Sequence, residues 1–293
     1  MPWPRYAAPR RLPTFSLCLS LPQLISWGSL FYTFSLLMGP LEAELGLTRA
    51  ESSLAFSLAL LAEGVGAYAV GRWIDAGHER RVMAWGSLWV GAGLGAHSLI
   101  DSLSGFYAVW AWLGVGMAAT LYNPAFAIVT RRFGQDFRRA VITITFLGGL
   151  ASTVFIPLVS WWIALWGWRT SLQLLALLQL AVCLPMHLWL LQGAPQAPSA
   201  QRAADAPASA RRSDGALRTH LRQPTFWLLT LFLVLTMALT SALPVHMIEL
   251  LGEAGLPAAW VVGIPAAIGV LQVFGRLLLF VFERRWDVHT ANR

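Results

Sequence analysis

Residues 71–81 of this chain read GRWIDAGHERR and join two long apolar segments. The segment before them is predicted to span a membrane over 50–74, and the segment after them over 81–100, because a helix needs about 20 apolar residues to cross a bilayer. The connection between them carries charges of both signs, so we expect it to lie at a membrane surface and not within the lipid.

Six further apolar segments flank this pair, at 13–38, 104–130, 139–164, 170–192, 225–247 and 257–282. Lipid offers backbone groups no hydrogen-bonding partners, so these continuous apolar runs are predicted to be helices, and they lack the ten-residue alternation of a β-barrel. The composition agrees, since only 12% of the residues are charged, whereas soluble domains carry about a quarter. The expected fold class is an all-α membrane protein with eight spans.

The basic residues predict the orientation. All 21 are Arg, and when the N-terminus is placed inside, only Arg49 and Arg169 fall in outside segments. Basic residues concentrate in the cytoplasmic segments of membrane proteins, so both termini are predicted to be cytoplasmic. The net charge of +7 does not indicate nucleic-acid binding, because the Arg residues lie between apolar segments and do not form one basic face.

Residues 193–224 differ from every predicted span. They are rich in Ala, Pro, Ser and Arg and could not bury a core, so they are predicted to form a flexible cytoplasmic linker. This linker divides six spans in residues 1–192 from two spans and a cytoplasmic tail in residues 225–293.

The loop at 71–81 resembles the signature of the major facilitator superfamily, which is a Gly, three residues, an Asp, and a turn that ends in paired basic residues. The matching positions are Gly71, Asp75, Arg80 and Arg81. The pattern departs at Ala76, where a basic residue is usual, and at His78, where Gly is usual. The resemblance implies an MFS-type helical bundle that moves a small solute by alternating access and needs no cofactor.

Two other stretches resemble bacterial, monocarboxylate-porter-like members of this family. They are LYNPAFA at 121–127, followed by Arg131-Arg132-Phe133, and GWRT at 167–170. The resemblance implies a bacterial inner-membrane transporter of a small organic solute, with carboxylates as one possible class.

The family normally has twelve spans in two six-helix halves, and eight are predicted here. We therefore expect a complete N-terminal half with two helices of the second half. Gly275-Arg276 resembles a degraded second copy of the loop signature, so the chain is expected to be truncated after its eighth span. A non-transporting membrane remnant or accessory subunit remains open as the alternative to a transporter.

Glu63 lies near the middle of the span predicted at 50–74. A charge facing lipid there would cost about 2.5–3.5 kcal/mol by insertion scales, and the small neighbours Ala59 and Gly66 suit close helix packing. Glu63 is therefore predicted to face the bundle or its cavity, where a carboxyl group could carry the proton of a symport reaction. A packing Glu that is hydrogen-bonded between helices is the alternative interpretation.

Polar residues in the first, fourth and seventh spans are candidates for the substrate pathway, because the resemblance implies that these spans line the central path. They are Gln23, Tyr32, Tyr122, Asn123 and Thr240. Pro124 should bend the fourth span and free a carbonyl one turn earlier. Each of these polar side chains could instead make a helix–helix contact.

The resemblance also gives Asp75 a gating role, in which it pairs with an Arg and caps a helix of the second half. Arg80, Arg131 and Arg138 are its candidate partners. No catalytic set or Cys/His cluster with metal-ligand spacing is found, and Cys18 and Cys183 lie in apolar runs as packing residues do. We therefore expect neither an enzyme nor a metal site.

Overall fold

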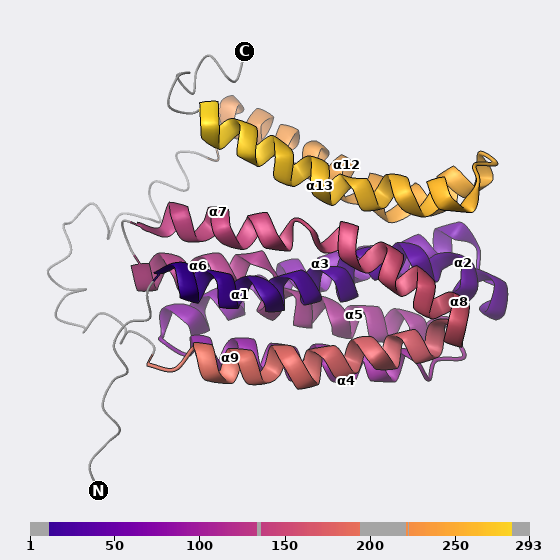
Figure 1. Ribbon diagram of the computed structural model, residues 1–293, viewed down its shortest axis with the longest axis horizontal. Helices are drawn as coiled ribbons and strands as arrows, with labels where there is room; N and C mark the ends of the chain where they lie inside the picture. The colour runs from indigo at the N-terminus through magenta and orange to yellow at the C-terminus, as the bar shows by residue number, and fades with distance from the viewer. Residues whose placement is uncertain (1–11, 134–135, 194–220, 222, 283–293) are drawn as a thin grey trace, which may run out of the picture.

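The computed structural model describes residues 12–133, 136–193, 221 and 223–282. The described secondary structure is helical, as predicted, and Figure 1 shows the helices running side by side along one long axis. In chain order the elements are α1 (Leu12–Trp27), η1 (Gly28–Tyr32), α2 (Thr33–Leu45), α3 (Arg49–Asp75), α4 (Glu79–His97), α5 (Leu103–Thr120), α6 (Tyr122–Phe133), α7 (Phe137–Gly148), α8 (Ala151–Leu178), η3 (Gln179–Cys183), α9 (Leu184–Leu190), α12 (Pro224–Glu253) and α13 (Ala258–Phe282).

Six of the described helices are long and apolar enough to cross a membrane. The helix from Phe137 to Leu190 has 54 residues, or about 80 Å at 1.5 Å per residue, which exceeds the bilayer thickness about twofold. Gly167 breaks it with a φ of 77° and a ψ of 168°, and the chain then returns along the bundle (Figure 1). The stretch therefore supplies the two spans predicted at 139–164 and 170–192.

The span predicted at 81–100 corresponds to α4, which is not among the six apolar helices. Its first turn carries Glu79, Arg80 and Arg81, and these charges lower its mean hydropathy. Its buried face packs against α5, α8 and α9, so α4 belongs to the bundle although its composition is less apolar.

The fourth span bends where Pro124 predicts it. Helix α5 ends at Thr120, Leu121 is extended with a φ of −79° and a ψ of −162°, and α6 begins at Tyr122. Pro124 has no N–H to donate to the Thr120 carbonyl four residues earlier. Gln23 of α1 supplies the missing donor, since its Nε2 donates to the Thr120 oxygen at 2.7 Å.

Helices α3 and α5 approach closely through small residues. A Cβ at Gly114 would lie 2.1 Å from the carbonyl oxygen of Ala59, and a Cβ at Gly66 would lie 3.2 Å from the Cβ of Ala118. Ala59 is fully buried. The predicted small-residue stripe around Glu63 is thus the surface on which α3 packs against α5.

Trp168 and Arg169, which follow the break at Gly167, connect helices at the end of the bundle that is predicted to face outside. Trp168 donates its indole N–H to Glu44 at 2.7 Å, and Arg169 pairs with the same carboxylate. Arg169 also donates to the carbonyl oxygen of Ile100 at 3.1 Å. The GWRT stretch therefore connects three helix ends at this end of the bundle.

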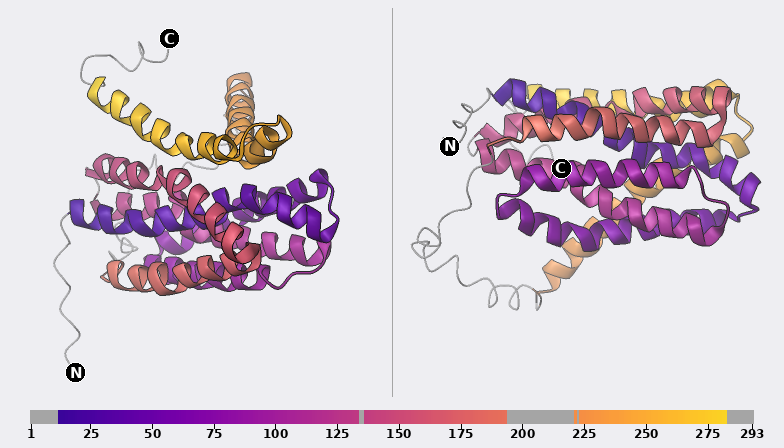
Figure 2. Two further views of the ribbon diagram at one scale, coloured as in Figure 1. Left: turned by 45° about the vertical axis from the view of Figure 1, so that its right-hand side comes forward. Right: turned by 90° about the horizontal axis from the view of Figure 1, so that it is seen from below.

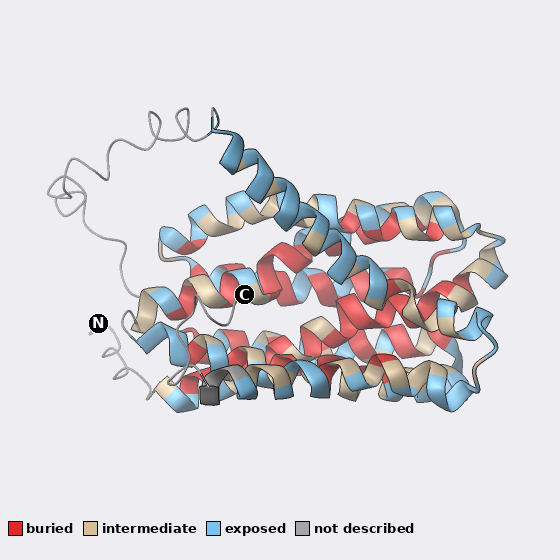
Figure 3. Cartoon of the chain, turned by 90° about the horizontal axis from the view of Figure 1, so that it is seen from above, coloured by how far each residue is buried: buried red, intermediate tan, exposed pale blue. Residues whose placement is uncertain are grey.

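Helices α12 and α13 lie together on one side of the other helices (Figures 1 and 2). Helix α12 packs on α2, and α13 packs on α8. Of the described side chains of α12, Val245 alone is buried, and Figure 3 shows most of this helix exposed. The linker predicted at 193–224 lies almost wholly outside the described residues, so its predicted flexibility stays a prediction.

Candidate functional site

A group of polar side chains lies where α13 meets the first six spans. Arg276 of α13 is half-buried and donates to the backbone carbonyl of Thr145 at the end of α7. Its guanidinium lies beside the hydroxyl of Tyr122 and close enough to Tyr32 for its charge to act on that phenol. The three side chains come from α13, α6 and η1, so they converge from three different spans.

Two glycines at the end of α7 make room for this group. A Cβ at Gly148 would lie 2.6 Å from the Tyr122 hydroxyl oxygen, and a Cβ at Gly149 would lie 2.6 Å from Nη1 of Arg276. Any larger residue at either position would collide with the side chain opposite. The close approach of the guanidinium and the phenol to α7 therefore depends on Gly-Gly at this point.

Further contacts fix α13 against this part of the bundle. The hydroxyl of Thr153 donates to the Ala266 carbonyl at 2.6 Å, and Gly269 lies against Ser152, which is also next to Tyr32. Tyr122 is oriented by aromatic neighbours, since it stacks on Phe126 with ring centroids 5.2 Å apart. The polar group therefore sits in a packed frame.

The predicted pathway residues lie in three different environments. Tyr32 and Tyr122 belong to the group around Arg276. Gln23 is fully buried and makes the helix–helix contact to α5 described above. Asn123 and Thr240 are exposed, and the Thr240 hydroxyl donates to the carbonyls of its own helix at 236 and 237.

Glu63, the predicted proton carrier, is half-buried on α3. Within the described residues it makes no hydrogen bond or ion pair. It lies on the same helix face as Ala59 and Gly66, at the edge of the contact with α5. The structure does not bring it into the group around Arg276.

The loop signature joins two carboxylates to two arginines. Arg131 approaches Asp75 with Nη1 3.8 Å from Oδ1, and it donates to the Asp75 carbonyl at 2.7 Å. Arg132 pairs with Glu79, whose side chain is fully buried, and Arg131 lies 4.0 Å from the same carboxylate. Of the three predicted partners of Asp75, Arg131 is thus the one that contacts it.

The other signature residues lie apart from this pair. Arg80 donates Nε to the Leu188 carbonyl of α9 at 2.8 Å, whereas the side chain of Arg81 is exposed. A Cβ at Gly71 would meet open space.

At the opposite end of the bundle, Arg49 joins α3 to α12. Its guanidinium lies 3.0 Å from Glu42, 3.1 Å from Glu249 and 3.2 Å from Glu253. Glu249 also packs against Gly39 of α2. This ion cluster ties the seventh span to the first two at the end predicted to face outside.

The family assignment follows from a comparison of the whole chain with protein-family models. The model described as Major Facilitator Superfamily matches residues 19–286. The chain belongs to the Major Facilitator Superfamily. The match confirms the family that the loop signature indicates and, with the helical structure, an MFS-type membrane bundle.

Among solved structures, this superfamily member is similar to the crystal structure of tetrameric PepTSo2 in the I4 space group, with a TM-score of 0.51 and 15% identity. The similarity covers 78% of this chain and 53% of that one, so this chain spans about half the length of PepTSo2. At this identity the likeness shows the fold alone. No individual curated protein matches the chain in sequence.

Sequence reasoning missed Arg276 as a pathway residue, although it noticed the Gly275-Arg276 pair as a second copy of the loop signature. The available signal is that Arg276 lies inside the apolar run 257–282, where a charge needs a partner. Glu79 and Arg49 were also missed, because only the fold shows which charges lie together. Within the described residues, no three His, Cys, Asp or Glu side chains are placed to hold a metal ion.

Proposed function

We propose that this superfamily member is a secondary transporter of a small organic anion, with carboxylates as the first class to test, and that it works by alternating access. The observation that carries this proposal is Arg276, a charged guanidinium inside a predicted span and flanked by two phenols. A guanidinium binds carboxylates well, because its planar donors match two carboxylate oxygens.

The placement of this group supports the proposal. Arg276 belongs to the second half of the chain, whereas Tyr32 and Tyr122 belong to the first six spans. A solute held between them would contact both halves at once, as alternating access requires.

We further propose a bacterial inner-membrane location with cytoplasmic termini, proton symport through Glu63, and no enzymatic activity.

The test is uptake by the full chain reconstituted in proteoliposomes, with radiolabelled lactate, pyruvate and oxalate as probes. We expect uptake of at least one anion, and we expect Arg276→Gln to reduce it by about 10- to 100-fold, since a hydrogen bond to a charged group contributes about 1.5–3 kcal/mol. Arg72→Gln is the matched control, because it removes the same charge from an exposed position on α3. Equal uptake by both variants would contradict the proposal.

The alternative is an accessory membrane protein, and the exposure of α12 favours it. A helix with most of its side chains exposed presents a long apolar surface to other membrane helices. A folded chain that carries none of the anions, and that co-purifies with another integral membrane protein, would support this alternative.

A further inference from the structure

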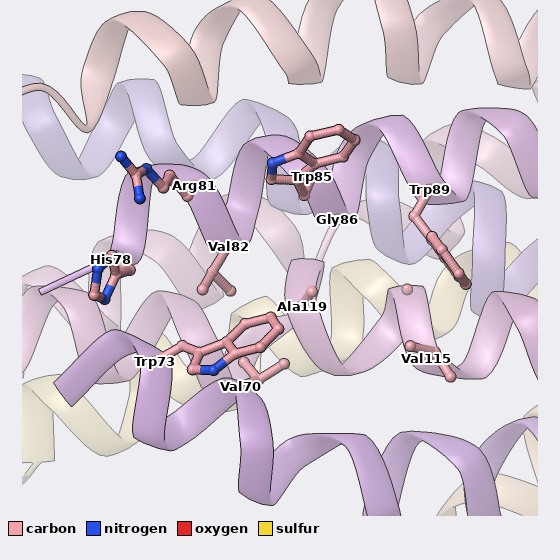
Figure 4. A pocket seen from close by; sticks show the side chains of 11 residues that line it. Val70, Trp73, His78, Arg81, Val82, Trp85, Gly86, Trp89, Val115 and Ala119 are labelled. Carbon is pink, nitrogen blue, oxygen red and sulfur yellow. The ribbon is translucent and has the colours of Figure 1, made fainter. Parts of the chain in front are cut away.

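A groove runs between α3 and α4 on the side of the bundle away from α12 and α13. It has a volume of about 630 Å³. Figure 4 shows Val70 and Trp73 on one wall, Val82 and Trp85 on the other, and α5 behind them. Most of the lining is apolar, so the groove suits hydrocarbon better than a water-soluble ligand.

The floor of the groove is made of small residues. Gly86 of α4 and Gly116 of α5 lie there with Ala119. A Cβ at Gly86 would come within 2.8 Å of the Ala119 Cβ, and one at Gly116 would come within 2.6 Å of Val90. Small residues thus form the floor between the larger side chains of the walls.

One end of the groove is basic. His78 and Arg81 lie there together, and Val115 and Trp89 lie farther along (Figure 4). Asp75 and Glu79 are the carboxylates nearest to Arg81 in the sequence. They pair with other arginines, since Asp75 contacts Arg131 and Glu79 contacts Arg132. Arg81 therefore has an exposed charge that no carboxylate of the described residues neutralises.

A second groove, of about 380 Å³, runs along the opposite flank of α4 against α9. Its lining includes Leu88, Leu184 and Leu188, and it shares Arg81 and Trp85 with the first groove. A smaller hollow of about 290 Å³ joins them at the basic end and is lined by His78, Arg80 and Arg81. Two apolar grooves thus diverge from one basic hollow.

We propose that a diacyl anionic phospholipid binds across the start of α4, with its phosphate at Arg81 and His78 and one acyl chain in each groove. The occupant is a lipid because the grooves open on the side of a membrane-spanning bundle. It is anionic because the basic end has no carboxylate of its own. Trp73 and Trp85 are exposed beside that end, and Trp is enriched in membrane proteins at the membrane–water interface, where phospholipid headgroups lie.

The test is native mass spectrometry of the full chain, delipidated in detergent and titrated with phosphatidylglycerol. We expect Arg81→Gln to weaken binding of the first lipid about fivefold, and Arg81→Lys to keep most of it. Val115→Trp and Leu188→Trp should each weaken binding by filling one groove. Lysophosphatidylglycerol, with one chain, should bind more weakly than the diacyl lipid.

Arg72→Gln is the control, since it removes an exposed Arg of α3 that does not line the groove. Equal affinity of Arg81→Gln and Arg72→Gln would overturn the proposal. So would equal binding of phosphatidylcholine, displacement by inorganic phosphate at millimolar concentration, or unchanged binding in both groove-filling variants. Arg81 and Arg72 are exposed, so Arg81→Gln and Arg72→Gln should both fold. Their comparison therefore tests the proposal even if a Trp variant fails to fold.

Discussion

Glu79 and Asp75 both lie beside Arg131, but they differ in burial, and this difference should give them unequal effects on stability. The Glu79 side chain is fully buried, whereas the Asp75 side chain is 78% exposed. Glu79→Gln keeps the shape of the side chain and removes its charge. It leaves Arg132, which is 13% exposed, facing a neutral amide.

The magnitude follows from burial. Two charges 4 Å apart interact by about 4 kcal/mol at an effective dielectric constant of about 20, and breaking a buried pair costs about 3–5 kcal/mol. We reduce this to about 3 kcal/mol, because Arg132 keeps weak contacts of 3.4 Å to the Gln192 carbonyl. Asp75→Asn removes an exposed charge 3.8 Å from Arg131, which is a pair of the kind that contributes about 0–1 kcal/mol.

The assay is thermal unfolding of each variant in detergent, followed by the amount of protein that still elutes as a single species after heating. At about 2–4 °C per kcal/mol, Glu79→Gln should lower the apparent midpoint by roughly 6–12 °C and Asp75→Asn by less than about 4 °C. A loss in Asp75→Asn equal to or larger than that in Glu79→Gln would refute the reasoning, because it would place the stabilising charge on the exposed carboxylate.

Three further predictions concern other parts of the molecule. A periplasm-active reporter should be silent when fused after Arg293 and active in the loop at 247–257; the opposite pattern would contradict the eight-span orientation. Glu63→Gln should abolish uptake driven by a pH gradient and leave counterflow intact, and unchanged pH-driven uptake would show that Glu63 only packs. Gly114→Ala should separate α3 from α5, because its Cβ would meet the Ala59 carbonyl, and should cost about 1–3 kcal/mol in thermal unfolding; a wild-type midpoint would show that the helices can shift freely.

The fold could be predicted because a segment that crosses lipid must satisfy its backbone hydrogen bonds internally. Continuous apolar runs must be helices, and the described helices coincide with the eight predicted segments. The break in the fourth span was also predictable, since Pro124 removes a backbone donor. The two π-helical turns at Gly28–Tyr32 and Gln179–Cys183 were not, because they depend on how neighbouring helices pack.

The site was predictable only in part. The fold places Tyr32 and Tyr122 beside Arg276, whereas Gln23 is used to satisfy the carbonyl that Pro124 leaves free. Hydropathy identifies which residues lie within a span, but the rotation of a helix about its axis decides which of them meet. The sequence therefore predicted candidate pathway residues, and the packing of α7 and α13 shows which of them lie beside Arg276.

The ion cluster at Arg49 holds α12 near one end, so a tilt of this helix would pivot there. The helix has 30 residues, and Val245, its buried side chain, lies near the end that Arg49 holds. The arm from Val245 to Pro224 is about 30 Å long at 1.5 Å per residue. A tilt of about 10° about this fulcrum would swing the free end by about 5 Å, close to one helical turn, while the ion cluster itself hardly moved.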